Sequence, residues 1–253
     1  MTTVTAPAGM LMKVAVVSDI HGNYHALEAV LSEVTAEGPD ELWCLGDIVG
    51  YGAEPNRCCA LIAERATLCL AGNHDLAAIG TLRVDDFNGD AASAVRWTQS
   101  VLSDDSRAFL GSLAPAATRA GVALFHGSPI DPVWDYILSE EGARLSFEAV
   151  TAGLILVGHS HIALALSATD GVLSGGLARG DAKFDLSAAR WLLNPGSVGQ
   201  PRGGDPRASW LLLDLDAGWA GFRRTEYAIE RTQAEIRAAG LPGVLATRLA
   251  LGQ

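Results

Sequence analysis

KVAVVSDIHGN, residues Lys13 to Asn23, joins an apolar run to an abrupt polar end. The apolar part, Val14 to Val17, shows no alternation with polar residues, which is typical of a strand buried on both faces of a parallel sheet. Asp19 and His21 follow two residues apart, a spacing at which both side chains can offer ligand atoms to one cation. An Asp in a turn before a helix more often caps that helix, so this stretch alone leaves both interpretations open.

The same arrangement recurs along the first half of the chain. Strand-like runs alternate with amphipathic helical patterns, and this order predicts right-handed crossovers and a parallel sheet. The next two strands also end in polar residues, with Asp47 after one and Asn73-His74-Asp75 after the other. The predicted elements are a helix at 24–37, a strand at 41–45, a helix at 55–65 and a strand at 67–71.

The second half is richer in strands. Residues 76–118 are mostly helical in pattern, with candidate helices at 90–101 and 105–113, and we expect them to form a helical insert. Further strands are predicted at 121–125, 153–157, 162–168, 189–193, 208–215 and 219–226, with a final helix at 230–239. We therefore expect a single α/β domain over 12–253, a four-layer α/β/β/α sandwich in which two mixed β-sheets are flanked by helices.

The composition and net charge of the chain limit the classes of molecule that it can bind. The chain has 253 residues, 49% of them hydrophobic, and a formal net charge of −11, which argues against broad nucleic-acid binding or attachment to anionic membranes. Residues 1–11 lack the basic region and long apolar core of a signal peptide, so we expect a disordered lead and a cytoplasmic protein. The four cysteines show no zinc-type spacing and are interpreted as buried apolar residues.

Five of the six histidines directly follow predicted strands. Ligands of open α/β sheets gather at the carboxyl ends of strands, so these residues together predict a metal site. The candidate ligands are Asp19, His21, Asp47, Asn73, His126, His159 and His161. Oxygen and imidazole donors without thiolates suit Mn, Fe or Zn, and seven ligands are too many for one ion but suit two divalent or trivalent ions that share a carboxylate.

Five motifs in this order resemble the calcineurin-like metallophosphoesterases. They are DIHGN (19–23), GDIVGYG (46–52), GNHD (72–75), the isolated His126 and GHSH (158–161). The resemblance implies that Asp47 bridges two metals, one held by Asp19, His21 and His161 and the other by Asn73, His126 and His159. It also implies that His74 is not a ligand but protonates the leaving oxygen or stabilises the phosphoryl group, and that Asp75 orients His74.

The resemblance implies a phosphoester hydrolase. Two metal ions lower the pKa of a bridging water from 15.7 to roughly 7, which supplies hydroxide near neutral pH. The motifs GDIVGYG and GNHD differ from the GDxVDRG and GNHE of phosphoprotein phosphatases, so a phosphodiesterase is favoured over a protein phosphatase. The alternatives are a non-catalytic metal-binding scaffold and a phosphate sensor with one metal.

The loop NPGSVGQPRGGDPRAS (194–209) resembles the bacterial small phosphodiesterases and proteins related to diadenosine tetraphosphatase. This similarity implies a small phosphate ester or a nucleotide as substrate. Ser197 and Arg202 or Arg207 are candidate phosphate contacts, although each arginine fits a surface salt bridge equally well. Trp134 and Tyr136 fit either stacking on a nucleoside base or ordinary packing.

Overall fold

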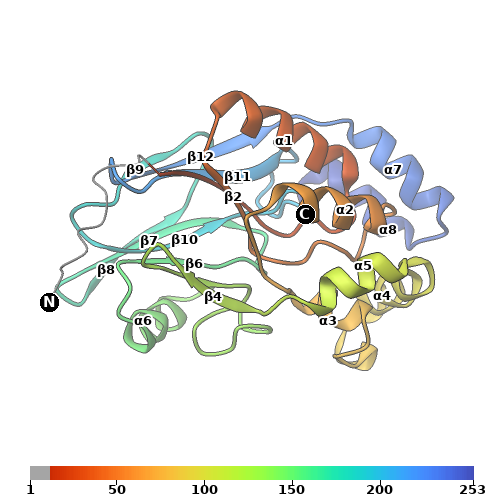
Figure 1. Ribbon diagram of the computed structural model, residues 1–253, viewed down its shortest axis with the longest axis horizontal. Coiled ribbons are helices and arrows are strands. Elements are labelled where there is room, and N and C mark those ends of the chain that lie inside the picture. Colours follow the sequence, from red (N-terminus) through yellow and green to blue (C-terminus); the bar gives the residue numbers. More distant parts are fainter. Residues whose placement is uncertain (1–11) are drawn as a thin grey trace, which may run out of the picture.

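The computed structural model describes residues 12–253 and consists of two six-stranded sheets stacked face to face (Figure 1). The expected lead at 1–11 lies outside the described residues. In spatial order, the first sheet contains β3 (Leu68–Cys69), β2 (Glu41–Cys44), β1 (Lys13–Val17), β11 (Ala208–Asp214), β12 (Trp219–Thr225) and β9 (Lys183–Asp185). The second contains β4 (Ala116–Arg119), β5 (Val122–Phe125), β6 (Leu154–Leu156), β10 (Arg190–Pro195), β7 (Ala163–Thr169) and β8 (Val172–Leu177).

Both sheets are mixed. In the first, β1, β2 and β3 are parallel to one another, and β11 pairs antiparallel with β1, with Ala15 opposite Leu212. In the second, β5, β6 and β10 are parallel, while β4, β7 and β8 run antiparallel to their neighbours. The parallel strands carry their polar ends to the same edge, which is why the predicted ligands can meet.

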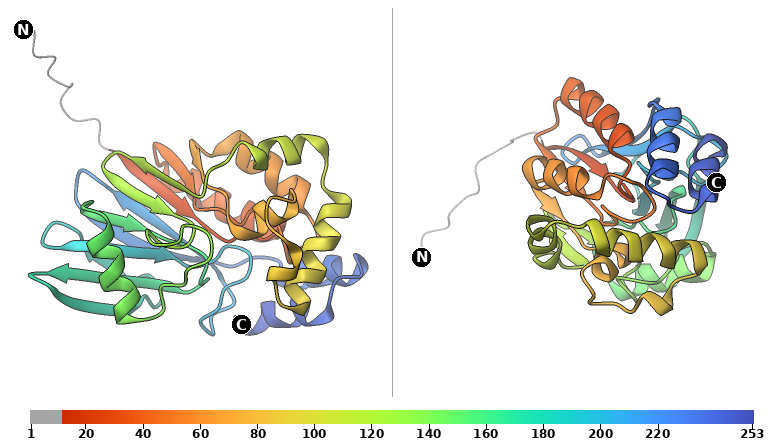
Figure 2. Two further views of the ribbon diagram at one scale, coloured as in Figure 1. Left: turned by 90° about the horizontal axis from the view of Figure 1, so that it is seen from below. Right: turned by 90° about the vertical axis from the view of Figure 1, so that its right-hand side faces the viewer.

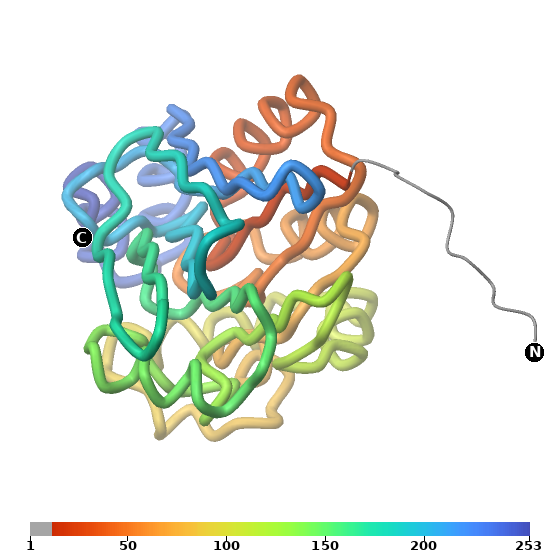
Figure 3. The backbone as a smooth tube through the Cα atoms, turned by 90° about the vertical axis from the view of Figure 1, so that its left-hand side faces the viewer, coloured from red at the N-terminus to blue at the C-terminus, as the bar shows by residue number. Residues whose placement is uncertain are grey.

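Helices cover both outer faces. Those of the first half are α1 (Tyr24–Glu37), α2 (Pro55–Arg65), α3 (Asn73–Ala78), η1 (Val84–Asp86), α4 (Gly89–Val101) and α5 (Asp104–Gly111). Those of the second half are α6 (Glu140–Ala149), α7 (Ile229–Ala238), α8 (Gly243–Thr247) and η2 (Arg248–Leu251). Figure 3 places α1 and α6 on opposite sides of the sheets.

The two faces of strand β1 pack against different layers of the fold. Its Val14 and Val16 belong to the apolar cluster between the two sheets, while Ala15 and Val17 belong to the cluster beneath α1 and α2. A third cluster joins the outer face of the second sheet to α6 through Phe147. A strand buried on both faces has no polar position, as its sequence shows, and the predicted four-layer α/β/β/α sandwich with two mixed sheets is confirmed.

The helical end of the molecule carries the site. Helices α3, α4 and α5 gather with α7 and α8 at one end of the sheets (Figure 2), the end at which β1 and β2 finish. Asn23 begins α1, since its side chain accepts a hydrogen bond from the amide of Ala26, and Gly38 ends it with a φ of 61°. No helix in residues 12–253 is long and apolar enough to cross a bilayer.

Several short elements differ from the prediction. The segment expected to be helical up to residue 118 ends in β4, which pairs with β5 through a tight turn at Ala120-Gly121. Strands β8 and β9 were not predicted, because their six and three residues carry little periodic signal of their own. Helix α6 was also not predicted, although Ser139 caps it and its pattern buries Ala143 and Phe147 on one face. Pairing with neighbouring strands and packing on the second sheet stabilise them instead.

Candidate metal centre

Sharp turns after the strands present the candidate ligands. Most of these residues adopt left-handed backbone conformations with φ between 51° and 63°, a set made up of Asp19, His21, Asp47, His159 and His161. Each such residue costs about 1–2 kcal/mol relative to ordinary backbone, although Asp and His tolerate the conformation better than most. Strain of this kind persists where the surrounding structure enforces it, and it is common at functional sites.

The turns bring seven polar side chains to one buried centre. Two groups have ligand atoms within 4.8 Å of one another: Asp19, His21, Asp47 and His161 in the first, and Asp47, His126 and His159 in the second. Asp47 belongs to both groups. Asn73 joins the second group, since its Oδ1 lies 3.2 Å from Nε2 of His126. The structure therefore brings together all seven residues that the sequence selected as ligands.

Hydrogen bonds on the far side of three imidazoles orient their rings. The Nδ1 atoms of His21, His126 and His161 lie 3.1, 2.9 and 2.7 Å from the backbone carbonyls of residues 49, 45 and 200. A carbonyl oxygen only accepts, so each Nδ1 carries the proton. Each Nε2 is left with a free lone pair directed at the centre, the arrangement that metal-binding histidines adopt.

Several buried atoms at the centre lack a hydrogen-bond partner within the described residues: Asp19 Oδ1 and Oδ2, Asp47 Oδ2 and His159 Nε2. Burial raises the pKa of Asp19 to about 7, and it raises the pKa of Asp47 well above its usual range. Burial also lowers the pKa of His159 to about 2, so this imidazole is neutral. Unpaired buried carboxylates are costly, and cations bound among them would remove that cost. The donor set therefore fits a pair of metal ions.

His74 lies beside the ligands without belonging to either group. Its ring centroid is 4.9 Å from that of His21, and its Nδ1 is buried without a hydrogen-bond partner in residues 12–253. Gly50 permits this approach, because a Cβ there would lie 2.4 Å from Nδ1 of His74. Burial lowers the pKa of His74 to about 3, so the free imidazole is neutral and has one N–H to donate.

Asp75 acts differently from the prediction. Its carboxylate accepts hydrogen bonds from the backbone amides of Ile48, Val49 and Gly72, at 2.9 to 3.1 Å. These bonds tie the turn after β2 to the start of α3, and both carboxylate oxygens are occupied by them. Asp75 is thus a positioning residue for the turn that carries Asp47, rather than a direct partner of the His74 imidazole.

The loop at 194–209 separates its candidate phosphate contacts. Ser197 is fully buried, donates to the carbonyl of Asp19 at 2.7 Å and accepts from the amide of residue 200, so its hydroxyl is not free for substrate. The hydroxyl instead holds the Asp19 turn, an arrangement that does not favour a contact between Ser197 and substrate. Arg207 pairs with Asp205 at 2.6 Å, the surface salt bridge that was the alternative. Arg202 lines a cavity of about 530 Å³.

Two tyrosines connect this cavity to the candidate ligands. The ring of Tyr51 packs 4.6 Å from His21 and 4.5 Å from His74, and Tyr136 stacks on His159 at 3.9 Å with an angle of 23° between the rings. Both tyrosines line the cavity. Trp134 packs instead against Phe87 at 5.1 Å. Tyr51 was not predicted as a site residue, although the glycines around it in GDIVGYG indicate that the backbone turns closely there.

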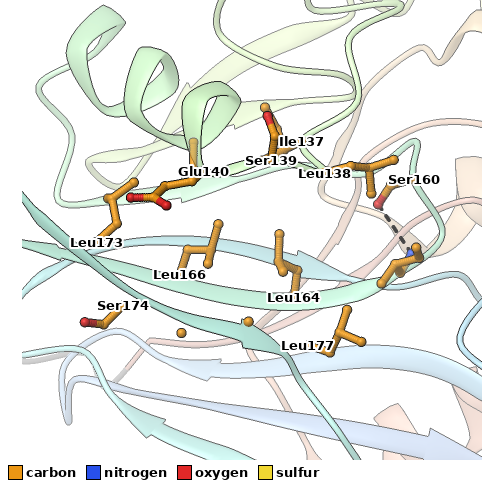
Figure 4. Close-up of a pocket in the computed structure, with 14 residues that line it drawn as sticks. Ile137, Leu138, Ser139, Glu140, Ser160, Leu164, Leu166, Leu173, Ser174 and Leu177 are labelled. Carbon is orange, nitrogen blue, oxygen red and sulfur yellow. Dashed lines mark hydrogen bonds between the residues drawn. The ribbon is translucent and has the colours of Figure 1, made fainter.

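A second cavity, of about 290 Å³, lies between α6 and the β7–β8 hairpin. Figure 4 shows Leu164, Leu166, Leu173 and Leu177 of the two strands beside it, with the carboxylate of Glu140 above. Ser160, between the two histidines of GHSH, lines its inner end. This groove is apolar, and Glu140 is the single charged residue among those that line it, so its chemistry differs from that of the cavity beside Arg202.

Two facing mixed sheets with buried Asp, His and Asn side chains at their strand ends define an α/β protein of the metallophosphoesterase class. Residues 12–218 match the calcineurin-like phosphoesterase superfamily domain, and the chain belongs to this superfamily. The resemblance drawn from the five motifs is confirmed.

Known relatives cover nearly the whole chain. A metallophosphoesterase from Sphaerobacter thermophilus is 41% identical, covers 96% of this chain and 100% of its own, and superposes with a TM-score of 0.86. The uncharacterized protein MJ0912 of Methanocaldococcus jannaschii is 38% identical over 95% of this chain and 98% of its own. A shorter similarity, 35% identity over 74 residues, links 28% of this chain to 27% of a symmetrical bis(5'-nucleosyl)-tetraphosphatase of Actinobacillus pleuropneumoniae.

Proposed function

We propose that this protein is a hydrolase of phosphoesters that works with two metal ions. One observation carries the proposal: Asp47 belongs to two buried ligand groups at once, while carboxylate and imidazole atoms of both groups lack any other partner in residues 12–253. A single shared carboxylate between two such groups is the arrangement by which paired ions clamp both oxygens of a displacement at phosphorus.

Each ion has its own ligands in this proposal. Asp19, His21 and His161 would hold one ion, Asn73, His126 and His159 would hold the other, and Asp47 would be shared by both. When bound, Mn, Fe or Zn ions supply Lewis acidity, which activates water near neutral pH and offsets negative charge on the phosphoryl group.

The remaining steps belong to the chain's own residues. His74 donates its N–H to the phosphoryl group or to the leaving oxygen, because its Nδ1 is unpartnered and its ring lies beside His21. Tyr51 and Tyr136 pack against the histidines and wall the centre from bulk water. Arg202, on the same cavity, contacts a phosphate oxygen.

A small phosphodiester or nucleotide is the proposed substrate class. The similarity to a bis(5'-nucleosyl)-tetraphosphatase supports a nucleotide, although it spans only 74 residues. A cavity of about 530 Å³, lined by the tyrosines that pack on the centre, is large enough for a small ligand. The absence of the GDxVDRG motif also favours a diesterase over a protein phosphatase.

The test compares hydrolysis of bis-p-nitrophenyl phosphate and p-nitrophenyl phosphate by stripped protein reloaded separately with Mn, Zn and Fe. We expect metal-dependent turnover, a preference for the diester and two metals per chain by elemental analysis. His74→Ala should lose most of this activity. His25→Ala is the matched control, since His25 pairs with Glu235 at 2.9 Å on the surface of α1.

Two results would overturn the proposal. Two bound ions without turnover of either ester would indicate a non-catalytic scaffold. Well under two metals per chain after loading with excess Mn, again without turnover, would indicate a phosphate sensor with one metal.

A further inference from the structure

The cavity beside the tyrosines contains two arginines that share one neutral partner. Arg202 and Arg248 both line it, and both are half-buried. The side-chain oxygen of Gln200 accepts from Nη2 of Arg202 at 2.9 Å and lies 3.4 Å from Nη1 of Arg248. Nε of Arg248 is buried with no hydrogen-bond partner in the described part of the chain. Several guanidinium donors are therefore left for another acceptor.

Neither arginine forms an ion pair with a carboxylate within residues 12–253, although the chain carries a net charge of −11. Two guanidinium groups on one amide oxygen repel each other, and an anion bound between them would turn that repulsion into attraction. The exposed Asp90 and Gln253, the last residue, also line the cavity, but neither the Asp90 carboxylate nor the terminal carboxylate pairs with Arg202 or Arg248.

The neighbouring cavities do not offer this combination. The apolar groove of Figure 4 carries Glu140 as its one charged lining residue, which would repel an anion. A cavity of about 400 Å³ that Arg202 also lines contains Arg179 and Arg224, but Arg224 already donates to the hydroxyl of Ser209 and the carbonyl of Ala178, and no tyrosine of the described residues lines this cavity. The cavity of Arg202 and Arg248 therefore differs in combining unpaired guanidinium donors with the two tyrosines that pack on the histidines of the centre.

The tyrosines place this charge next to the metal centre. Tyr51 and Tyr136 pack against the centre's histidines and also line the cavity that holds the arginines. The cavity therefore extends from two phenol groups, which contact the candidate ligand histidines and can donate hydrogen bonds, to Arg248 in η2. Residues 51, 136, 202 and 248 come from four separate segments, and each adds one wall.

We propose that this cavity is a second anion subsite, in which Arg202 and Arg248 bind a phosphate of the substrate other than the one at the metal centre. The inference rests on the proposed function and narrows its substrate class to phosphoesters that carry at least one further phosphate, such as nucleoside polyphosphates. Tyr51 and Tyr136 donate to the phosphate oxygens between the two positions.

Binding to metal-stripped protein tests the subsite without turnover. Calorimetry in the presence of a chelator should show that tripolyphosphate binds at least tenfold more tightly than orthophosphate or citrate. Arg248→Gln should weaken tripolyphosphate binding about tenfold, equivalent to ~1.4 kcal/mol. The matched control is Arg237→Gln, which removes the same charge from the exposed face of α7 and should change binding less than twofold.

A second measurement uses metal-loaded protein. Arg248→Gln should lower the ratio of kcat/KM for diadenosine tetraphosphate to that for bis-p-nitrophenyl phosphate about tenfold, and Arg237→Gln should leave the ratio unchanged. Arg248→Lys keeps the charge but loses the forked geometry and should give an intermediate value, which provides a test if the glutamine variant does not fold.

The two measurements separate this inference from the proposed function. If no ester is hydrolysed but tripolyphosphate binding depends on Arg248, the function fails and the subsite stands. Equal losses in Arg248→Gln and Arg237→Gln would show only general charge attraction and would overturn the subsite, as would undetectable tripolyphosphate binding. Equal affinity for citrate and tripolyphosphate would overturn its assignment to phosphate.

Discussion

Removing the charge of Asp19 should stabilise the metal-stripped protein while weakening its metal site. Asp19 is fully buried, both of its carboxylate oxygens lack a partner in the described residues, and burial raises its pKa from the ordinary 3.8 to about 7. Between these pH values the folded protein holds a proton that the unfolded chain has released. The free energy of unfolding therefore falls as pH rises from about 4 to about 7 and is lowest above that range.

The pKa difference sets the magnitude. At pH 8 the buried charge costs up to ~4 kcal/mol, at 1.36 kcal/mol for each unit of pKa. Local relaxation and water entry reduce this cost. We therefore expect Asp19→Asn to raise the free energy of unfolding of stripped protein by about 2–4 kcal/mol at pH 8. The gain should be ~2 kcal/mol smaller at pH 5, where the wild-type carboxyl is already protonated in the folded state.

This gain in the free energy of unfolding can be measured by urea unfolding at pH 8 and pH 5 in the presence of a chelator, with tryptophan fluorescence as the probe. The matched control is Asp170→Asn, because Asp170 is exposed and has a similar left-handed φ of 50°, so its change should stay within about 0.5 kcal/mol. Added Mn should stabilise the wild type more than Asp19→Asn. An Asp19→Asn protein that is less stable at pH 8, or equally shifted at both pH values, would refute the reasoning.

Three further changes test other parts of the structure. His74→Ala should retain both metals, by elemental analysis, but lose roughly 10²- to 10³-fold in kcat on an ester with a poor leaving group, because the hydrogen bond that its neutral imidazole donates is lost. Gly72→Ala should lose metal affinity and about 3 kcal/mol or more in urea unfolding, because its Cβ would lie 2.0 Å from Oδ1 of Asp47. The Arg119 guanidinium beside Glu41 holds the pKa of that carboxyl at about 2, below its ordinary 4.5. Glu41→Gln should therefore lower the free energy of unfolding in urea by ~1 kcal/mol at pH 7. This effect should disappear as pH falls from about 4.5 toward 2.

Each of these changes has a control or a contrary outcome. Full activity of His74→Ala on a poor leaving group would remove His74 from the mechanism. Gly111→Ala is the control for Gly72, since nothing lies within 4 Å of a Cβ at Gly111, and equal effects of the two would exclude the clash. A double-mutant cycle with Arg119→Gln isolates the ion pair, and a coupling near zero at pH 7 would assign the Glu41 effect to its bonds with Trp43 and Thr67.

The cluster of candidate ligands and the parallel strands were predictable because their signals are local. Val14 to Val17 has no polar position, so it can only be a strand buried on both faces, as the two apolar clusters show. The polar residues that follow each strand, among them Asp47 and His126, meet because parallel strands end at one edge.

Tertiary structure alone decided which polar groups remain free. Ser197 and Asp75 were sound candidates by residue type, yet backbone groups brought close by folding take up their oxygens. That Tyr51 and Arg248 lie together was not predictable, because residues nearly two hundred positions apart share a cavity only after both sheets and the last helices have packed. Local periodicity specifies the strands and the residues at their ends. Long-range packing decides which side chains already have hydrogen-bond partners and which remain free to bind a ligand.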